Sequence, residues 1–402
     1  MSTRSIFHAD HADHADHADH ADHADHADHA DHADGVRITQ SARLIEQIRG
    51  DIVGEWNAPK QIDQLPFNSE DNLERWSPMV RAEILAHRLH GDLRFGSENN
   101  TMTIYRRYCH EQSSKKEFQA VATAFGKPGL DPKKQDNSGA RLGFTLDVPV
   151  FAASQPASDL FLKQLKHVRT AQSQRGARSD EILRQRNDIV SFFAAIFGFH
   201  PKRHIYTIEL LATCLRALAP IEMEAKHWLA CRRPSELSGQ IHPVIQTPGH
   251  SSYPSGHATQ AYMLTTVLME LTGNYEACLY GTEKPFQRQS YKLAERIAHN
   301  RVIAGVHFPV DNACGALLGS VMGGHFLAKL KTKAFNNPSC FVPDCFDGGF
   351  DGLGFKKWWV GDTNTPPTYA VSLDAPPVNP PTEAQDCALN WLWCRALAEW
   401  AV

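Results

Sequence analysis

Apolar residues recur at a helical spacing along most of the chain from about residue 36 onward. This periodicity is typical of amphipathic helices packed around a core, and strand patterns are few. The spacing predicts helices over 37–53, 77–92, 103–124, 157–172, 179–198, 203–218, 221–232, 257–273, 287–303, 310–330 and 383–400. The chain is therefore expected to be all-α. Its most apolar stretch, 313–330, includes His325 and ends at Lys329, which favours a buried core helix over a membrane span.

Proline and glycine divide this helical pattern. Residues 125–156 are expected to form a long loop and residues 335–382 an irregular covering segment, since both stretches are rich in helix-breaking residues. Pro220 is expected to end the helix that starts near His204 and to start another. The resulting regions are a tail over 1–35, an N-terminal helical region over 36–200 that packs on the core, a helical-bundle core over 201–332, and an irregular segment with a C-terminal helix over 333–402.

The N-terminal tail contains nine copies of His-Ala-Asp over residues 8–34. A period of three matches neither the helical nor the strand repeat, and the repeat has no large side chain to bury. We therefore expect disorder here and exclude the repeat from the fold. Its alternating His and Asp side chains also leave open loose binding of divalent metal ions.

The charge of −4 comes from this tail, which carries nine Asp and one Arg before Gly35. The remainder has 40 Lys and Arg against 36 Asp and Glu, a net charge of +4. With no long basic run, this balance does not indicate a nucleic-acid partner.

The chain starts without the apolar segment of a signal peptide, so we expect a cytoplasmic protein. Monomer and homo-oligomer both remain open.

The first chemical motif is KHWLACRRP, from Lys226 to Pro234. Seven residues make two helical turns, so Lys226 and Arg233 are predicted to share one helix face, with Pro234 ending the helix. Two converging cations repel each other unless an anion lies between them. The alternative is a solvated basic face that includes Arg232.

The second motif is Pro254-Ser255-Gly256-His257, a turn followed by a helix. A helix N-terminus offers free N–H groups and partial positive charge, which together bind anions. Gly256 permits close approach of the backbone, Ser255 adds a hydroxyl donor, and His257 is placed to act as a base or nucleophile. The alternative is a Ser N-cap with an uninvolved His.

The third motif runs from Arg301 to Asp311, RVIAGVHFPVD. Arg301 and His307 would lie on different faces of a continuous helix, but Gly305 can break the helix and let them converge. Asp311 is then expected to accept the Nδ1 proton of His307, leaving Nε2 to bind a metal centre or attack phosphorus. The alternative is a helix-capping Asp near a surface His.

Together the three motifs resemble the pattern of the type-2 phosphatidic acid phosphatase (PAP2) superfamily, which joins soluble acid phosphatases, membrane lipid phosphatases and vanadium-dependent haloperoxidases. The resemblance covers 226–311, with Asn300 where most members have Ser. It implies a helical bundle of the acid phosphatase and haloperoxidase type, with extra N-terminal helices. In this resemblance His307 is the vanadium ligand or the phosphohistidine nucleophile, and His257 is the acid–base residue. The oxyanion oxygens are bound by Lys226, Arg233, Ser255, Gly256 and Arg301.

Residues outside the shared pattern help to predict which anion the site binds. His250 precedes His257 by seven residues, where vanadium bromoperoxidases carry a second His and chloroperoxidases carry Phe; it also reads as an ordinary loop histidine beside Gly249. Met223 stands where chloroperoxidases carry Trp. The long N-terminal region is also similar to that of haloperoxidases, and the sequence lacks the multiple spans of a lipid phosphatase.

The resemblance thus favours a vanadium-dependent haloperoxidase that binds vanadate. It would oxidise bromide or iodide with hydrogen peroxide to hypohalite, which halogenates a small organic acceptor. Its catalytic residues would be Lys226, His250, His257 and His307, with Asp311 orienting His307. The first alternative is a soluble acid phosphatase that binds phosphate and uses no metal. The second is a non-catalytic protein that binds anions or metal ions.

Overall fold

The computed structural model describes residues 73–98, 101–107, 140–147, 156–331, 339–341, 346–372 and 387–401, apart from residues 75, 347, 364, 368 and 369. Its helices are α5 (Pro78–His90), α7 (Pro156–Ala171), the 3-10 helix η2 (Gln172–Gln174), α8 (Arg175–Gln185), α9 (Val190–Phe197), α10 (Ile205–Leu229), α11 (Pro234–Leu237), α12 (Gly256–Tyr280), α13 (Pro285–Ala304), α14 (Pro309–Leu330), α15 (Gly352–Trp359) and α16 (Cys387–Ala398). The His-Ala-Asp repeat and the predicted helix 37–53 lie outside the described residues.

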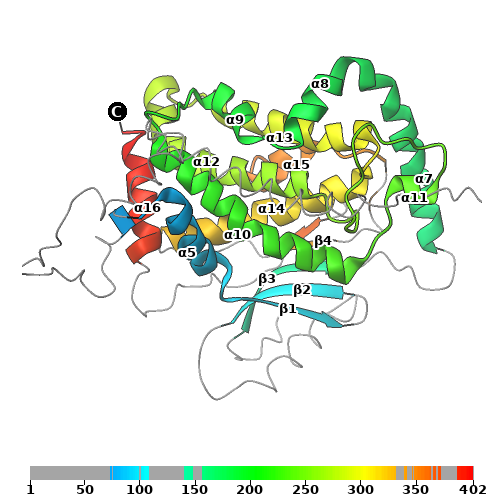
Figure 1. Cartoon of the computed structure of the whole chain (residues 1–402), viewed down its shortest axis with the longest axis horizontal. Coiled ribbons are helices and arrows are strands. Elements are labelled where there is room, and N and C mark those ends of the chain that lie inside the picture. Colours follow the sequence, from blue (N-terminus) through cyan, green and yellow to red (C-terminus); the bar gives the residue numbers. More distant parts are fainter. Residues whose placement is uncertain are drawn as a thin grey trace, which may run out of the picture.

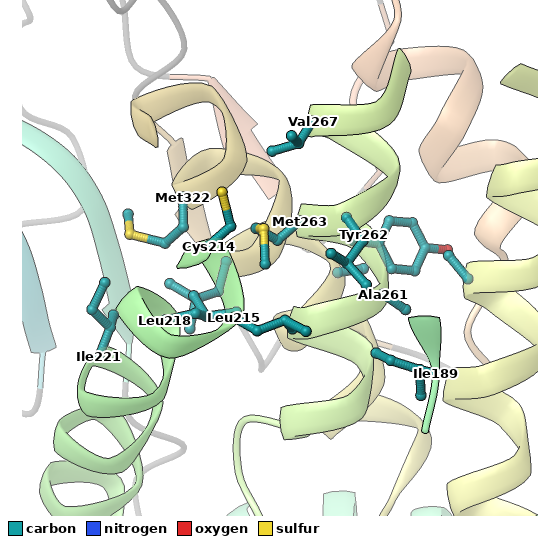
Figure 2. Packing of buried hydrophobic residues seen from close by; sticks show 14 of the residues in the cluster. Ile189, Cys214, Leu215, Leu218, Ile221, Ala261, Tyr262, Met263, Val267 and Met322 are labelled. Atoms are coloured by element: carbon teal, nitrogen blue, oxygen red, sulfur yellow. The ribbon is translucent and has the colours of Figure 1, made fainter. Parts of the chain in front are cut away.

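The core is a helical bundle built around α12 and α14, and Figure 1 shows α10 and α13 running beside them. Side chains from three helices meet in its centre, where Leu215 and Leu218 of α10 lie near Met263 of α12 and Met322 of α14 (Figure 2). All four side chains are buried. The predicted helical class is confirmed.

Three glycines let α14 approach α12 closely. Gly315, Gly319 and Gly323 recur every four residues on α14, and a Cβ added at any of them would collide with α12. At Gly319 the collision would be with the backbone carbonyl of Thr259. This contact sets the spacing of the two helices that begin at the second and third motifs.

Helix α14 is long and apolar enough to cross a membrane by length and composition, but 83% of its most apolar window is buried inside the protein. Burial against α12 explains its composition, since a helix that is apolar all round needs cover on every side. The predicted buried core helix is confirmed.

Two helix boundaries differ from the prediction. Pro220 lies inside α10 and does not break it. A proline removes one backbone hydrogen bond, but buried residues such as Leu218 and Ile221 on either side keep this helix continuous. The single helix predicted over 179–198 is two helices, α8 and α9, and the Asp188 side chain accepts a hydrogen bond from Ser191 N at the start of α9 (2.9 Å).

A five-stranded sheet lies along one side of the bundle (Figure 1). It is ordered β1 (Leu93–Glu98), β2 (Thr101–Arg107), β3 (Ala140–Asp147), β4 (Ser339–Phe341) and β5 (Ala370–Ser372), and only the β3–β4 pair is parallel. The helix predicted over 103–124 is therefore wrong for residues 103–107, and the rest of it lies outside the described residues. The predicted loop 125–156 contains β3, and the predicted irregular segment 335–382 contains β4, α15 and β5.

The predicted N-terminal helical region, 36–200, thus also contains the strands β1, β2 and β3. In β2, β-branched and aromatic residues favour a strand, and Met102 and Ile104 are buried two residues apart, as on one face of a strand. Helix α5, by contrast, lies as predicted. It begins after Ser77, and Arg81 binds Glu209 of α10 through two hydrogen bonds of 2.7 and 2.6 Å.

Substitution Gly319→Ala is expected to lower the free energy of unfolding by about 2 kcal/mol, because the added methyl group pushes α14 from the α12 backbone. Gly273→Ala in α12 is the matched control: nothing lies within 4 Å of the added Cβ, so stability should rise by about 0.5 kcal/mol. Urea unfolding of both variants measures the difference. Equal stability of Gly319→Ala and the wild type would contradict the close packing.

Candidate oxyanion-binding site

Lys226 lies in the last turn of α10 and is only 2% exposed. Its Nζ donates hydrogen bonds to three backbone carbonyls, those of Ser251 (3.1 Å), Ser252 (3.4 Å) and Pro254 (2.5 Å). Burial and the nearby Arg233 lower the pKa of Lys226. Three carbonyl acceptors nevertheless need three N–H donors, which only the ammonium form provides. The Lys226 ammonium thus ties α10 to the loop before α12.

Arg233 does not share a helix with Lys226, which corrects the first motif. Helix α10 ends at Leu229, Ala230 turns the chain in a left-handed conformation (φ 46°), and Arg233 precedes the short helix α11. The two residues still converge, because Cys231 N donates to Ser251 Oγ (3.0 Å) and Ser252 N to Cys231 O (2.9 Å). The loop after α10 is thereby tied to the residues before the second motif.

The buried guanidinium of Arg233 contacts two histidines. Its Nη1 lies 3.1 Å from His307 Nε2, and its Nη2 lies 3.1 Å from His250 Nδ1. Arginine only donates hydrogen bonds, so His307 Nε2 accepts. His250 Nδ1 also lies 3.2 Å from Ser251 O, which only accepts, so these two contacts do not fix the proton position on His250. Nη1 and Nε also donate to the carbonyls of Val306 (2.8 Å) and His250 (3.2 Å). Arg233 therefore connects the predicted anion site to His250, which argues against His250 as an ordinary loop histidine.

The third motif folds as predicted. Gly305 ends α13 with a left-handed conformation (φ 85°), α14 begins at Pro309, and His307 lies between them. His307 Nδ1 donates to Asp311 Oδ2 (3.0 Å), which also accepts hydrogen bonds from Phe308 N (2.9 Å) and Ser252 Oγ. Ser252 was not predictable as a site residue, because it is a loop Ser outside the three motifs.

Burial and charge keep His307 neutral. Burial lowers its pKa well below the ordinary value, and the cations Arg233 and Lys226 lower it further. Burial raises the pKa of Asp311, but the hydrogen bonds from Ser252 and Phe308 oppose that rise. The result is a neutral imidazole with its proton at Nδ1 and a lone pair at Nε2.

The second motif starts α12. Ser255 is the N-cap residue and Gly256 the first helical residue, and Ser255 N donates to Asp311 O (3.0 Å). Ser255 Oγ is buried and has no hydrogen-bond partner among the residues that the structure describes. His257 Nε2 lies 2.9 Å from Gln185 O, and because a carbonyl only accepts, this nitrogen carries the proton. A neutral His257 therefore presents an acceptor at Nδ1.

Arg301, in the last turn of α13, is 1% exposed. Its Nη2 donates to Ile182 O (3.1 Å) and Gln185 Oε1 (3.4 Å), but Nε and Nη1 are buried without partners. Burial lowers the pKa of Arg301 to about 10, so it stays cationic near neutral pH. The neighbouring Asn300 anchors α13 on α8 through Glu181 Oε1 (2.9 Å) and Gln185 Oε1 (2.8 Å).

These observations fit an oxyanion. A buried donor without an acceptor costs about 1–3 kcal/mol, more when it is charged. Ser255 Oγ and two nitrogens of Arg301 are such donors, and they accompany a helix N-terminus and two more buried cations. A tetrahedral anion such as phosphate or vanadate supplies acceptors in several directions and the missing negative charge. The cage can also offer that anion the His307 Nε2 lone pair once Arg233 Nη1, which donates to it in the anion-free protein, donates to the anion instead.

A separate cavity of about 470 Å³ has a different lining. It lies among α7, α8, α13, α14 and residues 349–350, and its wall includes Arg178, Lys292, Glu295 and His299. None of the predicted site residues lines it.

Residues 205–334, which form most of the helical core, match the sequence profile of the PAP2 superfamily. A vanadium-dependent bromoperoxidase from Ascophyllum nodosum is 34% identical over 108 residues, or 22% of this chain and 19% of that relative. The chain thus matches about a fifth of that relative's length. The crystal structure of a bacterial vanadium-dependent iodoperoxidase is 21% identical, with a TM-score of 0.32 over 44% of this chain and 50% of that one.

For the anion-free protein, His307 is expected to be a neutral Nδ1–H tautomer at about pH 6, where an ordinary histidine is mostly charged. ¹⁵N NMR of histidine-labelled protein reports the tautomer. Comparison with His307→Gln assigns the signal among the 22 histidines. An imidazolium signal for His307 at about pH 6 would contradict this electrostatic picture.

Proposed function

We propose that this protein is a vanadium-dependent haloperoxidase that oxidises bromide or iodide with hydrogen peroxide to hypohalite, which halogenates a small organic acceptor. The observation that carries the proposal is the link through Arg233 between the anion cage and His250. The bromoperoxidase relative supports the same chemistry. As a superfamily enzyme, the chain would act either in this way or as a phosphatase.

The buried donors fit vanadate as the cofactor. Its oxygens would be bound by Lys226, Arg233, Ser255, Gly256 and Arg301, and His307 Nε2 would be the protein ligand to vanadium. When bound, vanadate supplies a Lewis acid that activates peroxide without changing its own oxidation state. Asp311 orients His307 by holding its Nδ1 proton.

Two further residues would act on peroxide and halide. His257, protonated at Nε2 by its bond to Gln185 O, would accept a proton from hydrogen peroxide at Nδ1. Lys226 would donate a hydrogen bond to the peroxide oxygen once one of its three carbonyl bonds is exchanged. His250 would tune halide oxidation through its contact with Arg233.

The second candidate is a soluble acid phosphatase. The neutral His307 with its Nε2 lone pair favours it, because such an imidazole can attack phosphorus to give phosphohistidine. His257 would then protonate the leaving group, and the same cations would hold the phosphate. A non-catalytic anion- or metal-binding protein is the outcome if neither reaction occurs.

A paired assay separates these functions. We expect bromination of monochlorodimedone with vanadate, hydrogen peroxide and bromide, and little hydrolysis of p-nitrophenyl phosphate without vanadate. His307→Ala is the control in both assays and should abolish activity, because either chemistry needs Nε2. Hydrolysis that vanadate inhibits, with no halogenation in its presence, would replace the proposal by the phosphatase.

His250→Ala is expected to lower kcat/KM for bromide oxidation by about tenfold or more, and to change phosphate ester hydrolysis by about twofold or less. The reason is that His250 contacts the cage through Arg233, which keeps its other hydrogen bonds. His242→Ala, at an exposed position of the same loop, is the matched control. Equal, small effects on both reactions would make His250 uninvolved.

A further inference from the structure

One buried carboxyl group, that of Glu222, has no part in the motifs and lies against the anion cage. Glu222 is 1% exposed on α10, one turn before Lys226. A Cβ added to Gly256 would lie 3.3 Å from Glu222 Oε2 and 4.0 Å from Oε1, so both oxygens are at the first residue of α12. Oε2 accepts a hydrogen bond from Gln260 Nε2 (3.3 Å), and Oε1 is buried without a partner.

A carboxylate at this position stabilises the site when no anion is bound and opposes the binding of an anion. In the absence of an anion, its charge balances the Lys226 ammonium and is stabilised by the N-terminus of α12. Once an oxyanion binds at Gly256, two negative charges would face each other in a water-poor interior, which is strongly unfavourable. Protonation of one of them removes this repulsion.

Glu222 is the group best placed to take that proton. Burial raises its pKa to about 8, although Lys226 and Gln260 oppose the rise, so Glu222 is ionised in the anion-free cage above that pH. Near Glu222 and Lys226, burial raises the pKa values of the Cys231 and Cys314 thiols and of the Tyr253 phenol, so these groups stay uncharged. Burial also lowers the pKa of His307, and Arg233 stays charged. Asp311 Oδ2 accepts three hydrogen bonds, and burial raises the pKa of this carboxyl to about 6. Burial lowers the pKa of Lys226 to about 7, so Asp311, Lys226 and His257 are the other titratable neighbours.

We propose that Glu222 is a proton-accepting residue of the anion site: it is a carboxylate in the anion-free cage and takes up one proton from solvent when an oxyanion binds beside Gly256. The inference rests on the oxyanion site of the proposed function and applies to vanadate and phosphate alike. It makes anion binding proton-linked, so affinity falls as pH rises through the Glu222 pKa.

Isothermal titration calorimetry with tungstate tests this inference, because tungstate is a tetrahedral dianion that carries no proton near neutral pH. For the wild type, Kd should increase about tenfold or more between about pH 7 and about pH 9, and titrations at about pH 9 in buffers of different ionisation enthalpy should show uptake of roughly one proton. Glu222→Gln should bind more tightly at about pH 9, with a nearly constant Kd and little proton uptake. Glu224→Gln, exposed on the same helix, should match the wild type.

Three outcomes overturn the inference. Glu222→Gln with the pH dependence of the wild type would assign the proton to another group, such as His257. Weaker tungstate binding by Glu222→Gln at every pH would make the residue structural. If that variant does not fold, infrared difference spectra of the wild type with and without tungstate provide the test. The inference is overturned if tungstate produces no C=O band of a protonated carboxyl group. Wild type that binds neither tungstate nor vanadate would overturn the proposed function as well.

Discussion

Three cationic side chains, Lys226, Arg233 and Arg301, are buried at one end of a helical bundle, and the structure around them depends on how they are held. Most of their hydrogen bonds go to backbone carbonyls, those of residues 182, 250, 251, 252, 254 and 306. Carbonyls satisfy N–H donors without neutralising charge. The cations are therefore fixed in place while their field remains available to an anion, which is the preorganisation that electrostatic catalysis requires.

Helix packing supplies the geometry of this arrangement. The glycines of α14 bring its axis against α12, and at the start of both helices Asp311 O accepts a hydrogen bond from Ser255 N. The same Asp311 orients His307 through its carboxylate. Core packing and site geometry are thus coupled, because a change in the spacing of the two helices would move Ser255 away from His307.

Local features were predictable from the sequence, and features set by distant contacts were not. Gly305 and the four-residue spacing of His307 and Asp311 act within one turn, so the break and the hydrogen bond could be predicted. Helix α10 ends before Ala230, a position with no glycine or proline to indicate a helix end. Contacts of Cys231 with Ser251 and Ser252 determine this end, and the sequence does not reveal them. The apolar spacing of residues 103–107 resembled that of a helix, although these residues form part of strand β2. The helix-breaking tendency of Pro220 was also given too much weight, because tertiary packing outweighs propensity at this position. Glu222 lies outside the motifs and becomes a candidate only when α12 packs beside it.

The tautomer of His257 bears on the choice between the two chemistries. Its Nε2 proton is directed at Gln185 O, so the neutral ring offers an acceptor at Nδ1. Deprotonation of hydrogen peroxide needs such an acceptor, whereas cleavage of a phosphate ester needs a donor to the leaving group. A phosphatase would have to charge His257 while three buried cations surround the anion, and this works against protonation until the anion is bound. The bond from Nε2 to Gln185 O is kept in both the neutral and the charged ring, so the phosphatase chemistry requires the bound anion to supply the charge that stabilises the imidazolium.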